Sequence, residues 1–260
     1  LEWKRRKFPR FARLMLKIAE AIATLVATVL LCDSRAIGLY YRQRYHVSPI
    51  YIPNPAVPCT YESSEPLREF GLDAGEYYCV VARLEPENNI HLIIEGFKKS
   101  KSAKKLAVVG PLLPTKYLKE LMRMRNEKVL FLGGIYERER LMAIRKNCFA
   151  YIHGHEVGGT NPSLLEAMSC GNPILALDVP FNREVSRDAA LYFTNEAELA
   201  SDIHVLETDL EKSREMGKAA QEIATQEYSE ADIVRRYASL LSTVNVVHRP
   251  RAHRRHDRDR

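Results

Sequence analysis

The sequence is poor in cysteine, and its five cysteines form no CxxC pair. Their odd number and scattered positions exclude a disulfide scaffold and favour a reducing compartment: Cys32, Cys59, Cys79, Cys148 and Cys170. No segment repeats or has low complexity. With 46% apolar and 28% charged residues in 260, the composition excludes a wholly disordered or fibrous protein and fits one large domain or two small ones.

The sequence also lacks an N-terminal apolar run long enough to span a membrane. Residues 21–32 form an apolar run of twelve, whereas a spanning helix needs ~20 residues. No small-residue cleavage site follows the run, so it does not fit a secretory signal. A basic amphipathic helix can instead lie on an anionic bilayer. We expect a cytoplasmic protein and leave peripheral contact with the inner face of the membrane open.

Positive charge is concentrated at the two ends of the chain. Residues 1–17 carry a net charge of +6 and residues 249–260 one of +4, which leaves −4 for residues 18–248. The pI near 9.0 therefore describes the ends rather than the folded body. We expect residues 249–260 to be a solvated, disordered tail. Because no aromatic residue interleaves its arginines, we expect no nucleic-acid partner.

From residue 77 onward, short apolar runs alternate with stretches of helical pattern. The runs are YYCVVA, KLAVVG, KVLFLG, CFAYIH and NPILALD. Strands without polar alternation are expected where helices cover both faces of a sheet. The sequence therefore predicts an α/β fold, a Rossmann-like parallel sheet with helices on both faces. The predicted helices cover about 88–100, 114–125, 137–147, 162–170 and 181–187, followed by helices only over 196–246.

The N-terminal region predicts a helix, a strand and a second helix. Apolar residues recur at helical spacing over residues 11–25, and residues 28–32 predict a short buried strand. Ser34 can cap a helix over about 35–45. Residues 49–58 hold four prolines and predict an extended, turn-rich segment.

The string YIHGHEVGGTNPSLLEAM carries the most informative chemistry, because it leads from a predicted strand into a predicted helix. Pro162 suits the first helical position, and Asn161 or Thr160 can cap it. We expect the N–H groups of Ser163 and Leu164 to be free and, with the helix dipole, to form an anion site.

Neighbouring residues of the same string fit a ligand with both phosphate and hydroxyl groups. Gly158 and Gly159 have no Cβ, so that backbone and ligand can approach closely. Glu166 lies about one turn into the helix, where its carboxylate can accept hydrogen bonds from sugar hydroxyls. Phosphate beside hydroxyl is a nucleotide-sugar pattern, although glycines at such a turn also occur for packing alone.

A second loop follows the first predicted strand of the sheet, in the string VARLEPENN. Ligands of open parallel sheets bind beyond the carboxyl ends of the strands. The planar guanidinium of Arg83 suits a diphosphate there. The alternative is a surface ion pair between Arg83 and Glu85 or Glu87.

Together, ARLEPENN, FLGGIY and GHEVGGTNPSLLEAM resemble the retaining glycosyltransferases of family four, which have the GT-B fold. They are most similar to the rhamnosyltransferase branch used in bacterial surface polysaccharide assembly. The resemblance covers about residues 1–246. It implies that this chain holds the C-terminal, donor-binding half of the fold and a remnant of the N-terminal acceptor domain, most of which we expect to lie before Leu1.

The resemblance implies transfer of a sugar from a nucleoside diphosphate sugar to a saccharide or lipid-linked acceptor, with retention at the anomeric carbon. It implies dTDP-rhamnose as donor, with UDP and GDP donors left open, and neither a metal nor another cofactor. Arg83 would contact the diphosphate, Glu166 the ribose and Ile135 the base. The donor-binding residues so expected are Arg83, Asn88, Ile135, Gly158, Gly159, Thr160, Asn161, Ser163, Leu164 and Glu166.

Two positions depart from the family pattern. The family commonly has a glutamate eight positions before Glu166, where this chain has Gly158, and a lysine five after Arg83, where it has Asn88. His155 and Glu156 lie near enough to substitute and are our candidates for catalysis, although His155 could equally be a packed structural residue.

The expected organisation is an acceptor-domain remnant, a linker, a nucleotide-sugar-binding domain, a returning helix and a tail, at residues 1–56, 57–74, 75–225, 226–248 and 249–260. A lone strand and helix pair cannot bury its apolar faces, so we expect residues 1–56 to be poorly ordered or to self-associate.

Two alternatives remain open. His153 and His155 stand on one side of a strand end, where imidazoles could ligate zinc in a hydrolase, but His46 and His91 fall elsewhere and offer no third ligand. The chain could also bind a nucleotide without turning anything over.

Overall fold

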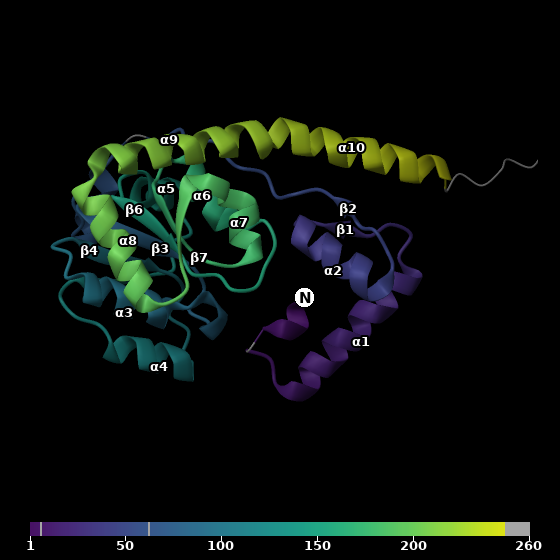
Figure 1. Ribbon diagram of the computed structural model, residues 1–260, viewed down its shortest axis with the longest axis horizontal. Coiled ribbons are helices and arrows are strands. Elements are labelled where there is room, and N and C mark those ends of the chain that lie inside the picture. Colours follow the sequence, from purple (N-terminus) through teal and green to yellow (C-terminus); the bar gives the residue numbers. More distant parts are fainter. Residues whose placement is uncertain (6, 62, 248–260) are drawn as a thin grey trace, which may run out of the picture.

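The computed structural model describes residues 1–5, 7–61 and 63–247. A small unit, residues 1–56, lies beside a main unit, residues 65–227, which contains the principal sheet (Figure 1). The tail predicted at residues 249–260 lies outside the described residues.

The main unit is built on a six-stranded sheet in which all neighbouring strands are parallel, in the order β5-β4-β3-β6-β7-β8. The strands are β3 (Tyr77–Val81), β4 (Lys105–Val109), β5 (Val129–Gly133), β6 (Ala150–His153), β7 (Ile174–Leu177) and β8 (Ala190–Phe193). The parallel sheet and its five predicted strands are confirmed. We did not predict β8, because it has only four residues, stands at the sheet edge and leaves its two central side chains partly exposed.

Helices cover both faces of this sheet, which explains why its strands are almost wholly apolar. Tyr77 and Cys79 of β3 belong to one core cluster, and Tyr78 and Val80 to the other. One face is covered by α3 (Ile90–Ser100), α4 (Lys116–Arg123) and α8 (Glu196–Thr208). The other is covered by α5 (Arg138–Lys146), α6 (Pro162–Ser169), α7 (Pro180–Ser186) and α9 (Leu210–Glu227). The 3-10 helices are η1 (Glu2–Lys4), η2 (Glu65–Phe70), η3 (Pro86–Asn88) and η4 (Arg187–Ala189).

The small unit consists of α1 (Arg10–Val26), β1 (Leu31–Cys32), α2 (Arg35–Tyr45) and β2 (Ile50–Tyr51). β1 and β2 form a separate two-stranded parallel sheet. The strand that we expected to be buried over residues 28–32 is shorter than that, and Leu31 is 43% exposed.

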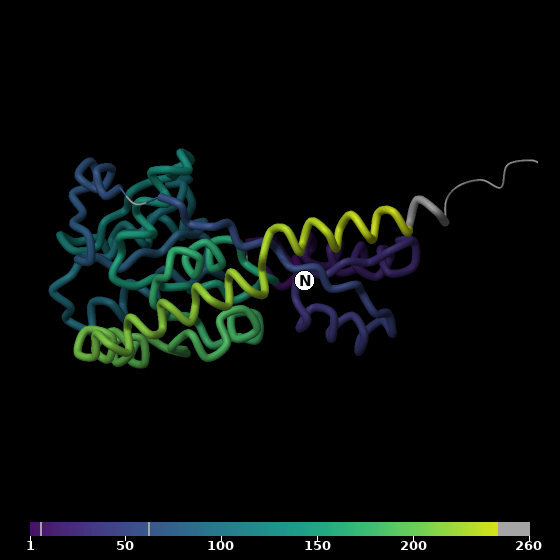
Figure 2. The backbone as a smooth tube through the Cα atoms, turned by 90° about the horizontal axis from the view of Figure 1, so that it is seen from above, coloured from purple at the N-terminus to yellow at the C-terminus, as the bar shows by residue number. Residues whose placement is uncertain are grey.

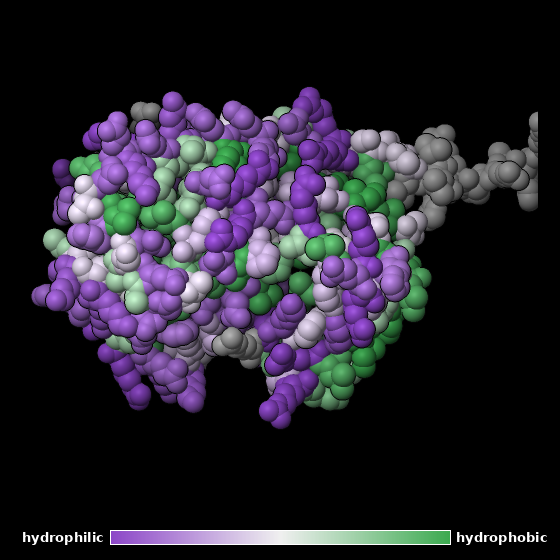
Figure 3. All heavy atoms as spheres, in the orientation of Figure 1, coloured by the Kyte–Doolittle hydropathy of each residue, from purple (hydrophilic) through white to green (hydrophobic). Residues whose placement is uncertain are grey.

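The apolar side chains of α1 lack a core to pack against. They are between 45% and 84% exposed: Phe11, Leu14, Met15, Ile18, Ile22 and Leu25. Figure 3 shows the hydrophobic colour gathered over this helix. The helical spacing is therefore confirmed, whereas the expected self-association stays a prediction.

The C-terminal helix connects the two units. The backbone N–H of Ala56 donates to the carbonyl of Tyr228 at 2.7 Å, next to a parallel bridge between Ala56 and Ser229. From there α10 (Glu230–Val247) follows on from α9 and runs along the small unit, as both ribbon and tube show (Figures 1 and 2). β2 and α10 line a groove between them. The domain boundaries themselves remain a prediction. Within the described residues, no helix has the length and apolar character needed to cross a bilayer.

Candidate functional site

A cavity of about 520 Å³ opens beyond the carboxyl ends of the strands, beside the point where the strand order changes direction. From β3 the chain continues outward to β4 and β5, whereas from β6 it continues to β7 and β8 on the other side. The loops after β3 and β6 therefore diverge and leave a crevice, which is the usual ligand position in such sheets.

The cavity brings most of the predicted site residues together. It is lined by Arg83, Ile135, His155, Gly158, Gly159, Thr160, Asn161, Ser163 and Glu166. Three predicted residues do not line it. Leu164 is fully buried in a core cluster, Asn88 is buried with its amide donating to the Arg83 carbonyl at 2.7 Å, and the backbone N–H of Glu156 donates to the Glu87 carbonyl. Asn88 thus shapes the loop that carries Arg83 instead of facing a ligand.

The start of α6 differs from our expectation of free amides. The N–H of Ser163 donates to Asn161 Oδ1 at 2.9 Å, and the N–H of Leu164 donates to the Asn161 carbonyl at 3.1 Å. The N-cap that the sequence allowed therefore uses the amides that we assigned to an anion. Among the described hydrogen bonds, none is donated by the backbone N–H of Gly158 or Gly159, so the open amides lie one turn earlier, in the glycine loop.

Glu166 is held at the cavity by a buried arginine that the sequence analysis missed. Arg145 of α5 is 3% exposed, and its Nη2 lies 2.7 Å from Glu166 Oε2 and 3.3 Å from Ser163 Oγ. The Glu166 side chain is 30% exposed, and among the described residues none forms a hydrogen bond or ion pair with its second oxygen, Oε1. This ion pair fixes the carboxylate and leaves one oxygen to accept a hydrogen bond. Its signal in the sequence was an arginine three positions after Met142, on the apolar side of α5.

Arg83 lines the cavity and also forms the surface ion pair with Glu85 that we gave as the alternative to diphosphate binding. Its Nη1 is 3.7 Å from Glu85 Oε1, and its side chain is 55% exposed. Lys7 competes for the same carboxylate at 3.2 Å. An exposed pair at this distance is weak, so that the guanidinium is free to turn to an anion in the cavity.

The two histidines stack on each other with ring centroids 4.3 Å apart. Burial, together with the positive charges of Arg5 and Arg83, lowers the pKa of His155 to about 4. Burial and the neighbouring His155 also lower the pKa of His153. Both rings are therefore neutral near pH 7. In the described part of the chain, no three His, Cys, Asp or Glu side chains are grouped so that they could hold a metal ion.

The small unit contributes three further residues to the cavity, none of which we predicted: Arg5, Asp33 and Asn54. Asn54 Nδ2 donates to the Thr160 carbonyl at 2.6 Å. The Thr160 N–H and hydroxyl both donate to the Asp33 carbonyl. These bonds dock the small unit onto the glycine loop.

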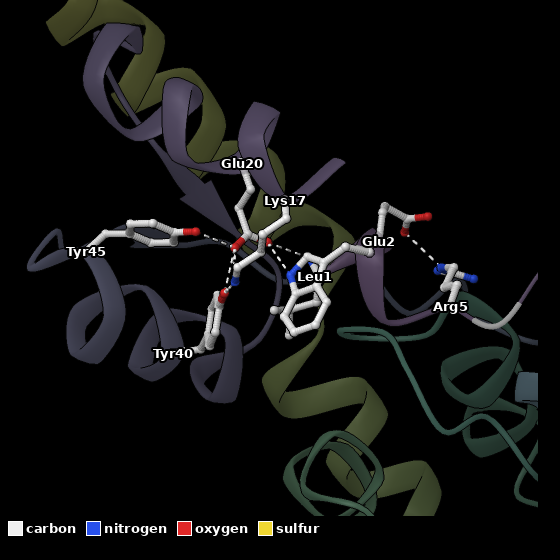
Figure 4. A network of polar contacts seen from close by, with 8 residues as sticks. Leu1, Glu2, Arg5, Lys17, Glu20, Tyr40 and Tyr45 are labelled. Carbon is white, nitrogen blue, oxygen red and sulfur yellow. Dashed lines mark hydrogen bonds and ion pairs between the residues drawn. The ribbon is translucent and has the colours of Figure 1, made fainter. Parts of the chain in front are cut away.

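Arg5 reaches the cavity because the segment before it is anchored in the small unit. Glu20 is buried and accepts hydrogen bonds from Trp3 Nε1 at 3.0 Å, Tyr40 at 2.6 Å and Tyr45 at 2.9 Å (Figure 4). Burial alone would raise the pKa of Glu20, but the hydrogen bonds from Tyr40, Tyr45 and Lys17 and the positive N-terminus together outweigh it, so that the pKa is lowered and the carboxylate is charged. This network holds residues 1–5 against α1 and α2.

Known proteins resemble this chain both in sequence and in fold. The sequence model of the family described as "Glycosyl transferases group 1" matches residues 68–223. "Glycosyltransferase 1 domain-containing protein 1" of Xenopus tropicalis is 27% identical over 131 residues, which are 48% of this chain and 37% of that protein. The chain thus matches well under two thirds of this curated relative.

Solved structures share the fold. The Anabaena protein Alr3699/HepE, in complex with UDP-glucose, matches with a TM-score of 0.77 at 22% identity, over 88% of this chain and 67% of that chain. Sucrose-phosphate synthase of Thermosynechococcus elongatus matches with a TM-score of 0.78 at 18% identity, over 93% of this chain and 64% of that one. Both likenesses establish the architecture, that of GT-B glycosyltransferases.

Proposed function

Because this chain belongs to the glycosyl transferases of group 1, we propose that its cavity binds a nucleoside diphosphate sugar and that the sugar is transferred from it to an acceptor. The observation that carries the proposal is the cavity at the strand-order switch, lined by arginines and by the fixed carboxylate of Glu166. In a solved relative by fold, HepE, UDP-glucose is bound.

In this proposal Glu166 binds the ribose. Arg145 occupies one carboxylate oxygen at 2.7 Å, and the other accepts the hydrogen bond of a ribose hydroxyl. The loop with Ile135 and the largely exposed Tyr136 lines the same cavity. These two side chains give the base an apolar and aromatic surface.

The diphosphate lies against Arg83 and the open amides of Gly158 and Gly159. Arg5 supplies the second cation, in place of the lysine that the family has where this chain has Asn88. When the bond between the anomeric carbon and the diphosphate oxygen breaks, negative charge grows on the diphosphate. The two guanidinium groups stabilise that charge.

His155 is neutral near pH 7 and therefore adds no charge to this cluster. Its imidazole can donate or accept one hydrogen bond with a sugar hydroxyl. It is the catalytic candidate that lines the cavity, whereas Glu156 does not.

The finer assignments rest on the motif resemblance. We propose dTDP-rhamnose as donor, a saccharide or lipid-linked acceptor, retention of the anomeric configuration, no metal in the site, and a role in surface polysaccharide synthesis. The exposed apolar face of α1 suits self-association of residues 1–56, and the basic residues before it suit an anionic bilayer.

Two measurements test the proposal. Chromatography of reactions with dTDP-rhamnose, UDP-glucose or a GDP-sugar should show release of the nucleoside diphosphate in the presence of a saccharide acceptor. Binding without release would favour the nucleotide-binding alternative. Arg83→Met should weaken binding of the nucleoside diphosphate about ten-fold, the effect of one charged hydrogen bond. Arg183→Met, which removes an exposed arginine paired with Asp178, is the matched control and should change nothing.

A further inference from the structure

Asp33 is a carboxylate at the cavity that pairs with none of the cavity arginines. Apart from its own backbone N–H, no described residue donates a hydrogen bond to its side chain or forms an ion pair with it. The ion pairs that the three cavity arginines form in the free protein are with other acids: Arg145 with Glu166, Arg83 with Glu85 and Arg5 with Glu2. The ionised carboxylate of Asp33 can therefore accept a hydrogen bond from a ligand in the cavity.

The side chain of Asp33 lies directly on the glycine loop. A Cβ added to Gly159 would overlap both carboxylate oxygens, whereas one added to Gly158 would meet nothing within 4 Å. Only glycine leaves room for the acid at this position, so the sequence of the loop and the place of Asp33 are matched.

The backbone of Asp33 is fixed from both sides. Thr160 donates to its carbonyl, as described above, and Glu184 of α7 caps the helix that begins directly after it. The Glu184 carboxylate accepts hydrogen bonds from Ser34 Oγ at 2.6 Å, Arg35 N at 2.7 Å and Ala36 N at 3.2 Å. A glutamate of the main unit thus holds the helix N-terminus of the small unit and, with it, Asp33.

This placement is electrostatically unfavourable for the free protein. Burial, with the negative charge of Glu184 nearby, raises the pKa of Asp33. The phosphates of a nucleoside diphosphate would repel this acid, and its ribose is bound by Glu166 in the proposed function, whereas the transferred or accepting sugar offers further hydroxyl donors. The ligand group that fits is therefore a sugar hydroxyl.

We propose that Asp33 accepts a hydrogen bond from a sugar hydroxyl in the cavity and that Glu184 is the residue that positions Asp33. This inference rests on the proposed function. The hydroxyl belongs either to the donor sugar or to the acceptor saccharide, and the two sources are separable by titration. Asp33 then contributes to the affinity for the sugar and makes no favourable contribution to the affinity for the nucleotide.

The test compares ligands with and without the sugar. Calorimetry measures dTDP against dTDP-rhamnose and UDP against UDP-glucose, and methyl α-rhamnoside or methyl α-glucoside titrated into protein saturated with dTDP or UDP. Asp33→Asn should lower the affinity for the sugar nucleotide or for the glycoside about ten-fold or more. The affinity for dTDP and UDP should not fall, because at the phosphates the substitution removes only repulsion. Asp73→Asn, an exposed acid before β3, should match the wild type throughout.

Glu184→Gln should reproduce the sugar-specific loss, and the Asp33→Asn Glu184→Gln double variant should lose no more than Asp33→Asn alone. A purely structural Glu184 would instead lower all affinities together. Equal losses for dTDP and dTDP-rhamnose, or wild-type affinity of Asp33→Asn for every sugar ligand, would overturn the Asp33 assignment alone. Absence of nucleotide binding in the wild type would overturn the proposed function as well.

Discussion

Removing the Glu166 carboxylate should destabilise the protein as well as weaken a ligand. Arg145 is 3% exposed, its Nε has no partner among the described residues, and without Glu166 its guanidinium keeps only Ser163 Oγ at 3.3 Å and Met142 Sδ at 4.0 Å. Breaking a buried ion pair costs about 3–5 kcal/mol. Because Glu166 is 30% exposed, we expect about 2–4 kcal/mol of lost unfolding free energy for Glu166→Ala, measured by urea denaturation.

Urea denaturation of a double variant distinguishes the cost of leaving Arg145 buried without a partner from the cost of losing a contact. Arg145→Met Glu166→Ala should be more stable than Glu166→Ala, because the unpaired buried cation is gone. Glu222→Ala is the matched control, since that glutamate is an exposed partner of Lys218 on α9. If Glu166→Ala were as stable as Glu222→Ala, or if the double variant were the less stable one, Arg145 would not depend on Glu166. For affinity measurements Glu166→Gln is therefore the better variant.

Three further outcomes follow from the packing. The pKa values of His153 and His155 are lowered in the folded state, so on acidification these histidines take up protons in the unfolded state before they do so in the folded state. The free energy of unfolding should therefore fall as the pH drops from about 6.5 towards 4. A denaturation midpoint that stays constant over this range would contradict the lowered pKa values. Gly159→Ala should lower the thermal midpoint through its overlap with Asp33, whereas Gly158→Ala should not; equal midpoints would contradict the close approach. Residues 11–45 should exchange amide hydrogens faster than the main sheet in a monomer and become protected only when sedimentation shows association; uniform protection in a monomer would argue against an unsatisfied apolar face.

Five strands of the main sheet were predictable because each lies in a largely apolar run, as a sheet covered on both faces requires. The sixth, β8, was not predicted; it stands at the sheet edge, and its two central side chains are partly exposed. The spacing over α1 gave the helix correctly. That its apolar face would lie open was expected from a different argument, that a lone strand and helix pair cannot bury it, because burial depends on what packs against the helix.

The site was predictable as far as it is local in the sequence. Gly158 to Glu166 follow one another along a single loop and helix turn, so they reach the same cavity. Asp33 and Arg5 arrive there through tertiary packing, which no spacing reveals, whereas the place of Arg145 on the apolar side of α5 was its one signal. The prediction of free amides at the start of α6 was wrong for a local reason. Asn161 at the N-cap accepts the hydrogen bond of the Ser163 N–H, which would otherwise be open to an anion, and we treated the helix cap and the anion site as separate roles.

If the cavity binds a nucleoside diphosphate, calorimetric titration of the full chain with dTDP, UDP and GDP should detect it. We expect one-to-one binding of at least one of these nucleotides to the wild type, and about ten-fold weaker binding to Glu166→Gln. Absence of binding heat for all three, or equal affinity of the wild type and Glu166→Gln for the nucleotide that binds, would contradict this expectation.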